Sequence, residues 1–582
     1  MSAASTSIAA QAAPAPARQP SGTRIGEHSI QWGLAVLTVL LVLAPIVPIL
    51  YQSFIDRPLY DAGHVLTADN YVRLIRTSDF WSAVGNTLML AVGSTLIAVV
   101  VGVLAAILVG RTDMPGRSVI GEVFLWPLYV SSLVLSFAWA TVYGPSGYVV
   151  QAFEAALGFA PWNLFSLAGM AVVAGVSMAP IVYVYTLSSA KLTDASFEDA
   201  ARIAGAGRFA TLMNVTLPLM KPAIFFSALL TFTGALEVLS IPLVFGEPSG
   251  IRTLSTLLYR FTTSGGNPDY GLVATAALLL IAVVAGLLTL QTKLVGNTRK
   301  YETVGGKAGR QRLFQLGQGT RWIVAAAAGL YVFAAVIMPL GILVLRASVR
   351  ILHPLVPLSE VLSLQNFRAL LEFPTYTRSI VNSFLVAGIG AFVATVFILL
   401  VAIVIHRSDF RFKGPLLFMS LLPRAVPGLI AGIGFFYAIA MFPPFAPLRS
   451  TIWILIIAFT MANIPLGYGA IGPMLMKLSP ELDRAARVQG ATWWTTVTRI
   501  VIPLAKPAMI ACYTILFIAF FKEYSAAVFL YSVGSEVIGT TLLAFWTQGQ
   551  VGHVAALSVV QIATIGICLA LARKFFGVRL YG

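Results

Sequence analysis

Long apolar runs dominate the chain and alternate with short polar segments. An α-helix needs about 20 consecutive, mostly apolar residues to cross a bilayer. By this criterion we predict about twelve membrane spans. They fall at residues 32–54, 83–110, 119–143, 163–190, 222–245, 271–292, 322–346, 380–405, 416–441, 451–474, 507–530 and 554–572. The pattern therefore predicts an all-α protein that crosses a membrane many times.

Two of the polar segments are copies of each other. Residues 198–222 match residues 483–507 without a gap, at an offset of 285. Other positions repeat at an offset of 296, namely Asn86, Arg111, Asp113 and Pro127 with Asn382, Arg407, Asp409 and Pro423. The change of offset requires a deletion of 11 residues in the second half, where the loop after the third span is shorter. We therefore predict two tandem six-helix repeats in the same orientation, related by an axis along the membrane normal.

The repeats set the expected domain boundaries. Residues 1–31 are rich in Ala, Pro, Ser and Gln and are expected to form a disordered cytoplasmic tail that lacks the features of a cleavable signal peptide. The first repeat is expected at 32–295, with its core at 82–292. A cytoplasmic linker at 296–320 is expected to join it to the second repeat at 321–582, whose core is at 378–572.

The composition excludes the soluble classes. Of the 582 residues, 58% are hydrophobic and 10% are charged, and the mean hydropathy is +0.87. Of the 38 Lys and Arg residues, 26 fall in segments expected in the cytoplasm, 10 in outer segments, and two, Arg424 and Lys522, within spans. This asymmetry follows the positive-inside rule and predicts that both termini are cytoplasmic. It also explains the net charge of +16 without a nucleic-acid partner.

Residues that commonly carry catalysis or bind metals are few and scattered. Cys512 and Cys568 both fall inside predicted spans, and the five histidines are far apart, so neither a disulfide framework nor a metal site is expected. Residues 305–308 come nearest to a phosphate-binding loop. There Tyr301 stands in place of the first Gly of that motif, and Ala308 in place of its Ser or Thr. We therefore expect no catalytic residues and no enzyme activity on this chain.

The repeated polar segment is the best candidate for a functional site. In the first copy a short helix is expected after Ser196, supported by Glu198 and Arg202 at i,i+4. Ala201 and Gly205 are predicted to give this helix a bare face, and a second short helix is expected to end at Pro218. The second copy repeats this pattern at the offset of 285. A connector packed on its own bundle is the alternative, but two gapless copies favour a surface that faces a partner.

At these residues the chain resembles the permease subunits of bacterial binding-protein-dependent ABC importers of the type I fold. Their signature is Glu-Ala-Ala, three residues, Gly, nine residues, Ile, any residue, Leu-Pro. The matching positions are Asp199, Ala200, Ala201, Gly205, Val215, Leu217 and Pro218 in the first copy, and Arg484, Ala485, Ala486, Gly490, Ile500, Ile502 and Pro503 in the second. Asp199 and Arg484 depart from the Glu of the family pattern, and Ile502 departs from its Leu.

The resemblance implies a transport function. In that family the loop forms a coupling helix that docks on an ATPase subunit, so Glu198 and Asp483 are expected to belong to two ATPase-coupling sites. ATP and magnesium would bind to the two partner ATPase subunits, and no cofactor to this chain. The other expected partners are a periplasmic or extracellular substrate-binding protein and the lipid bilayer of a bacterial inner membrane.

The double length of the chain most resembles the ferric-iron permease branch of this family. Residues 531–537, which follow Lys522, Glu523 and Tyr524, contribute to this resemblance. Relatives built in the same way carry thiamine, phosphonates, sugar phosphates or polyamines, so these substrates remain alternatives. A secondary transporter with two six-helix halves is the runner-up in function, because residues 110–117 resemble its loop signature with a spacing that is off by one.

Four charged residues fall well inside predicted spans, away from the span ends. A charge at the bilayer centre costs about 2.5–3.5 kcal/mol on insertion scales, so each one needs a reason. Glu237 and Lys522 occupy equivalent positions in the two repeats, Glu523 is adjacent to Lys522, and Arg424 lies in the ninth span. We predict that these residues line the translocation path or its gate. The alternative is an ion pair that fixes the packing of the two repeats.

Overall fold

The chain is helical almost throughout. The computed structural model describes residues 21–192, 195–263, 268–295, 313–350 and 357–577. Within these residues there are helices, turns and three isolated β-bridges but no strand. Eleven helices are long and apolar enough to cross a membrane, and a bent pair makes a twelfth if it is counted as one span. The predicted all-α fold with about twelve spans is confirmed.

The spanning helices follow the predicted order in both repeats. Those of the first repeat are α1 (Ser21–Ser53), α3 (Ser78–Arg111), α6 (Ser132–Tyr143), α8 (Leu167–Leu192), α11 (Leu217–Glu237) and α13 (Tyr270–Val295). Those of the second repeat are α14 (Gln318–Val332) with α15 (Met338–Ala347), α18 (Pro374–Leu385) with α19 (Ala391–Arg407), α20 (Lys413–Leu421) with α21 (Gly428–Met441), α22 (Ile452–Lys477), α25 (Ile502–Phe521) and α28 (Val551–Phe576).

The third span of each repeat is broken at proline. In the first repeat α4 (Arg117–Phe124) and α5 (Trp126–Tyr129) precede α6, and Pro127 lies in α5. In the second repeat α20 and α21 meet at an angle of 108° around a 3₁₀ turn that contains Pro423. Proline has no N–H group and its ring clashes with the preceding turn, so the helix cannot continue straight through it.

The fifth span of each repeat begins and ends earlier in the chain than predicted, at Phe209–Glu237 and Trp493–Phe521. The helix α11 ends at Glu237, and α25 ends at Phe521. The chain then turns and forms the short helices α12 (Leu254–Thr263) in the first repeat, and α26 (Ala527–Leu530) and α27 (Ile538–Thr547) in the second. The predicted spans 222–245 and 507–530 were therefore wrong at both ends. Apolar residues continue for several positions beyond each helix end, at 238–245 and 524–531, so the apolar run did not reveal the break.

The two repeats interlock through their first helices. The helix α1 packs on α21 of the second repeat as well as on α13 of its own, and α15 packs on α6 of the first repeat as well as on α28. The hydroxyl of Tyr143 in α6 donates a hydrogen bond to the carbonyl of Ala334 at 2.7 Å. Each repeat therefore covers part of the other.

Gly434 allows the close crossing of α1 and α21. A Cβ atom at this position would lie 2.4 Å from the carbonyl oxygen of Pro45. Overpacking of this kind typically costs about 1–3 kcal/mol, and here the neighbour is backbone. We expect Gly434→Val to lower the free energy of unfolding by at least that amount, measured by thermal unfolding of the detergent-purified chain. Gly469→Val, where no atom lies within 4 Å of the added Cβ, is the matched control and should leave stability nearly unchanged.

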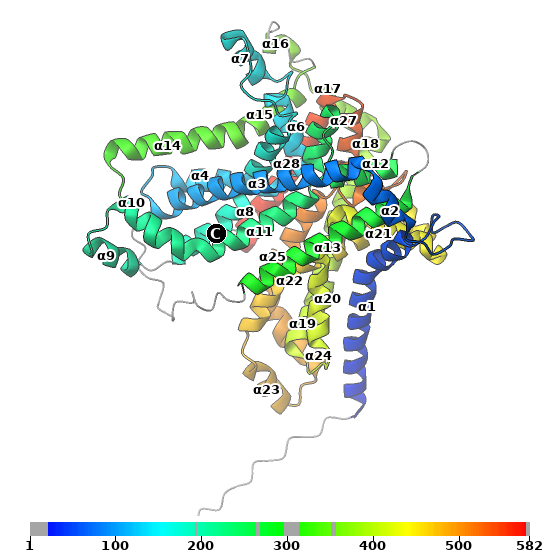
Figure 1. The fold of residues 1–582 in the computed structure, drawn as a ribbon. Helices are drawn as coiled ribbons and strands as arrows, with labels where there is room; N and C mark the ends of the chain where they lie inside the picture. Colours follow the sequence, from blue (N-terminus) through cyan, green and yellow to red (C-terminus); the bar gives the residue numbers. More distant parts are fainter. Residues whose placement is uncertain (1–20, 193–194, 264–267, 296–312, 351–356, 578–582) are drawn as a thin grey trace, which may run out of the picture.

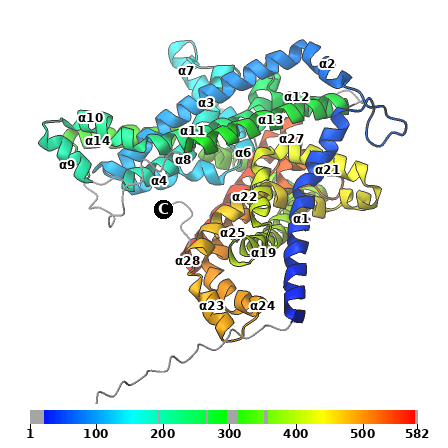
Figure 2. The same cartoon turned by 60° about the horizontal axis from the view of Figure 1, so that its bottom comes forward.

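The two repeats diverge away from a shared region. In Figures 1 and 2 α3, α8 and α11 of the first repeat run toward α9 (Ala195–Ile203), α19, α22 and α25 of the second run toward α23 (Glu481–Val488), and these two short helices lie apart in both views. The first helix of each repeat lies in the other arm, since α14 packs on α4 and α1 packs on α19 and α20. One large apolar cluster contains residues of both repeats, whereas the arm that carries α9 also has its own cluster around Tyr183 and Met220. The molecule is therefore joined at one side and split at the side of α9 and α23.

Candidate functional site

The candidate site consists of two matching loops, the first repeat loop (residues 195–216) and the second repeat loop (residues 479–501). The first contains α9, α10 (Arg208–Thr211) and a π-helical turn. The second contains α23, α24 (Trp493–Thr496) and a π-helical turn. Each π turn runs directly into the next spanning helix, which has Pro218 or Pro503 in its first turn. We expected these prolines to end the preceding helix, and this expectation was wrong, because they lie in the first turn of the next helix. A proline is tolerated there because the N–H groups of a first turn have no partner within the helix.

The signature glycine of each loop ends its helix. Gly205 has φ +87° and Gly490 has φ +80°, in the left-handed region that favours glycine. The N–H groups of Ala206 and Ala491 donate to the carbonyls of Ala201 and Ala486, at 2.9 and 3.0 Å. This is the hydrogen-bond pattern of a glycine-terminated helix. The predicted bare face that includes the glycines was wrong, since both glycines lie beyond the helix end.

A buried ion pair fixes the first repeat loop to the end of α3. The carboxylate of Glu198 accepts hydrogen bonds from the guanidinium of Arg111 at 2.6 Å and from the hydroxyl of Thr216 at 2.8 Å. The side chains of Arg111 and Glu198 are 1% and 4% exposed. Glu198 thus pairs across the fold, and the predicted pair with Arg202 is replaced by this contact. An ionised group that is this deeply buried needs such a partner.

The second repeat loop has the same attachment. Arg407, the counterpart of Arg111, lies 3.4 Å from the carboxylate of Asp483, the counterpart of Glu198. Arg407 also donates to the carbonyl of Leu478 at 3.2 Å, and its own carbonyl accepts the indole N–H of Trp493 at 2.9 Å. The Asp483 side chain is 19% exposed, so this pair is more open than the first. Both loops are therefore attached to the second span of their own repeat.

The remaining predicted loop residues lie at or near the surface. In the first loop Asp199 and Ala201 are half-buried and Ala200 is exposed. In the second loop Arg484 and Ala485 are exposed. Ala486 is buried.

Each loop also exposes three large apolar side chains that the sequence analysis missed. We define the first apolar face as Phe197, Ile203 and Phe209, with exposures of 46%, 88% and 72%. The second apolar face is Leu482, Val488 and Trp494, with exposures of 38%, 83% and 45%. The two sets correspond at the offset of 285. The signal was available, since a large apolar residue recurs at three matching positions of an otherwise polar segment.

The charged residues of the fifth spans meet between the repeats. The ammonium of Lys522 donates a hydrogen bond to the carbonyl of Leu128 in the broken third span of the first repeat, at 2.6 Å. Glu523 accepts from the N–H of Ala526 at 3.2 Å and interacts electrostatically with Glu237 at the end of α11. Among the residues that the structure describes, no ion pair joins Glu237, Lys522 and Glu523. The predicted alternative, a fixed ion pair between the repeats, is absent from this arrangement of the described residues.

Lys522 and Glu523 line a small polar cavity between the repeats. The cavity has a volume of about 210 Å³. The first repeat contributes Ser131, Ser132 and Ser177 to its wall. Arg424, the fourth predicted path residue, is exposed in the 3₁₀ turn before α21 and does not line this cavity. The structure therefore places two of the four predicted residues, Lys522 and Glu523, at this cavity, whereas neither Glu237 nor Arg424 lines it.

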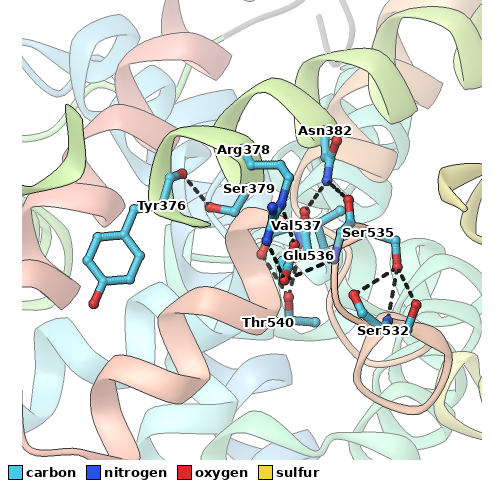
Figure 3. Close-up of polar contacts among 10 residues, drawn as sticks. Tyr376, Arg378, Ser379, Asn382, Ser532, Ser535, Glu536, Val537 and Thr540 are labelled. Carbon is cyan, nitrogen blue, oxygen red and sulfur yellow. Dashed lines mark hydrogen bonds and ion pairs between the residues drawn. The ribbon is translucent and has the colours of Figure 1, made fainter. Parts of the chain in front are cut away.

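A polar junction holds the turning segment at the opposite side of the molecule from the repeat loops. Arg378 at the start of α18 binds the carboxylate of Glu536 through two hydrogen bonds of 3.0 Å (Figure 3). The amide of Asn382 donates to the carbonyls of Gly534 and Glu536 at 3.0 and 2.9 Å. Burial raises the pKa of Glu536, but the hydrogen bonds from Arg378 and Gly534 outweigh burial and leave this pKa below its ordinary value. The pair is therefore charged at neutral pH.

The first repeat builds the same junction with reversed charges. Asp79 at the start of α3 pairs with Arg252 at 2.7 Å, and the amide of Asn86 donates to the carbonyl of Arg252 at 2.9 Å. Asn86 and Asn382 are the pair that the sequence repeat identified, and both hold the turning segment after the fifth span.

Comparison with known proteins extends the sequence resemblance. The family model described as "Binding-protein-dependent transport system inner membrane component" matches residues 95–356 and 394–580. The chain is 28% identical over 427 residues to a putative ferric transport system permease protein of Haemophilus influenzae, a match that covers 72% of this chain and 65% of that protein. It is 26% identical to the ferric transport system permease protein of Actinobacillus pleuropneumoniae, covering 91% of this chain and 76% of that protein.

The chain is also similar to one further transporter sequence and to one solved transporter structure. A probable ABC transporter permease protein of Sinorhizobium fredii is 25% identical over 552 residues and 93% of each chain is covered. A solved bacterial ABC transporter that imports alginate matches 48% of this chain and 99% of its own, with 18% identity and a TM-score of 0.41. The family model covers most of both repeats. The chain belongs to the family of binding-protein-dependent transport system inner membrane components.

Proposed function

We propose that the chain is the permease of an ATP-driven importer and that the two repeat loops are its docking sites for two copies of a separate ATPase. The observation that carries this proposal is the pair of apolar faces on the two repeat loops, exposed at matching positions. Single exposed apolar residues are ordinary on a protein surface. Large, clustered apolar side chains are typical of the centre of a protein interface.

The attachments of the loops support a mechanical role. Glu198 connects α9 to the end of α3 through Arg111, and Asp483 connects α23 to the end of α19 through Arg407. A displacement of either docking helix would therefore pull on the second span of its repeat. Because the two repeats diverge toward α9 and α23, movement of two ATPase subunits toward each other would close that side of the molecule.

The path between the repeats would run past Glu237, Lys522 and Glu523. These groups lie at the breaks of the fifth spans, where charged residues are costly and usually functional. In this proposal the repeat loops and both termini face the cytoplasm, in keeping with the basic residues of those segments. A substrate-binding protein would deliver cargo to the opposite face, near the Arg378–Glu536 junction.

We propose ferric iron as the substrate. The relatives from Haemophilus influenzae and Actinobacillus pleuropneumoniae are named as ferric transport permeases. The carboxylates of Glu237 and Glu523 are of the ligand type that hard cations prefer. A 2-aminoethylphosphonate permease is also similar to this chain, but that match covers only 24% of it.

Charging both apolar faces tests the docking. We expect the double variant Ile203→Glu, Val488→Glu to lose co-purification of the co-expressed ATPase and to lose ATP-dependent uptake of radioactive ferric iron into proteoliposomes. The reason is that a carboxylate would be forced into a desolvated interface. Each single variant should retain one docked ATPase. Val533→Glu, at a position that is 89% exposed on the other side of the molecule, is the control for ATPase co-purification.

Two results would contradict the proposal. One is wild-type co-purification of the ATPase by the double variant. The other is uptake by the purified wild-type chain on an ion gradient without any ATPase, which would favour a secondary transporter. Unlabelled thiamine, phosphonates, sugar phosphates and polyamines, added as competitors, test the choice of ferric iron in the same vesicles.

A further inference from the structure

The linker between the repeats contributes a short segment to the first repeat loop. The N–H of Phe314 donates to the carbonyl of Arg111 at 2.7 Å, and the N–H of Asp113 donates to the carbonyl of Phe314 at 3.2 Å. Thr112 and Phe314 thereby form a parallel β-bridge. The N–H of Leu316 donates to the carboxylate of Asp113 at 2.8 Å. Residues 314–316 are thus fixed along the turn that follows α3.

The side chain of Phe314 supports the end of α9. The residue is only 8% exposed, although it belongs to a linker. The guanidinium carbon of Arg202, in the last turn of α9, lies 5.2 Å from the centre of the Phe314 ring. At this distance a cation and an aromatic face attract each other. The linker therefore contacts both the turn that anchors the loop and the helix that the loop presents.

The second repeat shows what the same residues do without a linker. Arg487 and Asp409, the counterparts of Arg202 and Asp113, face each other directly with 3.5 Å between guanidinium and carboxylate. In the first repeat Arg202 lies on the Phe314 ring, and Asp113 accepts the N–H of Leu316. The linker has therefore come between two residues that pair in the other copy.

We propose that residues 314–316 form a built-in brace, with Phe314 as a positioning residue, which sets the orientation of α9 alone. This inference rests on the proposed docking of an ATPase on each repeat loop. The two docking sites of the fused chain then differ: the linker braces the first, whereas in the second Arg487 and Asp409 form only an exposed pair at the surface. The linker thus does more than join the repeats, since it determines how the first site meets its ATPase.

Site-specific cross-linking can separate the two docking sites. A photo-activated cross-linking residue is placed at Ile203 or at Val488 in the full chain, and the yield of adduct with the co-expressed ATPase is measured. We expect Phe314→Ala to reduce the yield at position 203 several-fold and to leave the yield at position 488 unchanged. Phe314→Tyr keeps the ring under Arg202 and should restore the yield.

A second variant addresses the backbone part of the brace. Asp113→Ala removes the acceptor for Leu316 and should also reduce the yield only at position 203. Asp409→Ala is the matched control in the second repeat, where the pair is exposed, and should leave both yields near wild type. In addition, Phe314→Ala should lower the kcat of transport-coupled ATP hydrolysis with little change in the KM for ATP, because the nucleotide binds elsewhere.

Equal losses at both positions in Phe314→Ala would overturn the inference, since the effect would then be a general loss of structure. Unchanged yields at position 203 in both Phe314→Ala and Asp113→Ala would overturn it as well. Absence of adduct at both positions in the wild-type chain would instead refute the proposed docking on which the inference rests.

Discussion

Replacing Glu198 with alanine is expected to have the largest effect on coupling of any single change in the repeat loops. The substitution leaves the guanidinium of Arg111, which is 1% exposed, without its partner. Breaking a buried ion pair from one side typically costs about 3–5 kcal/mol. We expect α9 to detach from α3 and transport-coupled ATP hydrolysis to be lost. ATPase assays in proteoliposomes and thermal unfolding measure the two effects.

Two controls make this prediction specific. Asp483→Ala breaks the more open pair of the second repeat and should cost clearly less stability, because the Asp483 side chain is 19% exposed. The double variant Arg111→Met, Glu198→Leu removes both charges and should recover most of the stability, since apolar replacements of a buried pair are often neutral. It should not recover coupling. Equal losses of stability in Glu198→Ala and Asp483→Ala would contradict the role assigned to burial.

Neutralising Glu237 is expected to reduce transport at least tenfold without reducing the amount of protein in the membrane. A charged residue at membrane depth costs about 2.5–3.5 kcal/mol on insertion scales, so Glu237→Gln should insert no worse than the wild type. The loss would come from the site between the repeats, where Glu237 and Glu523 interact. Uptake and basal ATP hydrolysis, normalised to membrane abundance, provide the measurement.

The matched control for Glu237→Gln lies on the surface. Glu122 pairs with Arg573 at 2.7 Å, with side-chain exposures of 62% and 64%, so Glu122→Gln should change little. Lys522→Met, which removes the hydrogen bond to Leu128, should alter basal ATP hydrolysis because it frees one contact between the repeats. Wild-type uptake by Glu237→Gln would show that the carboxylate is only a packing residue.

Most of the fold was predictable because the bilayer imposes a length on every spanning helix. Apolar runs gave the number and order of the spans. The ends of the fifth spans were not predictable. Apolar residues continue beyond each helix end, at 238–245 and 524–531, so the apolar content of these segments does not mark the turn.

The loops were predictable in position but not in their contacts. The repeat spacing identified both loops, yet the partners of Glu198 and Asp483 lie 87 and 76 residues away in the sequence, at Arg111 and Arg407. The i,i+4 rule concerns neighbours on one helix and therefore does not predict pairs between distant segments. The repeated Arg111 and Arg407 were a signal that these positions matter, but only the folded chain shows what they contact.

The interlocking of the first helices has a consequence for biosynthesis. The helix α1 emerges first, but α21, on which it packs, ends only at Met441. At translation rates of about 5–20 residues per second, α1 waits on the order of tens of seconds in the bilayer before this partner exists. The first repeat therefore cannot complete its packing while it is being made, and during that interval α1 is exposed to lipid, insertion machinery and quality-control proteases. Ribosome pausing within the second repeat would lengthen this exposure.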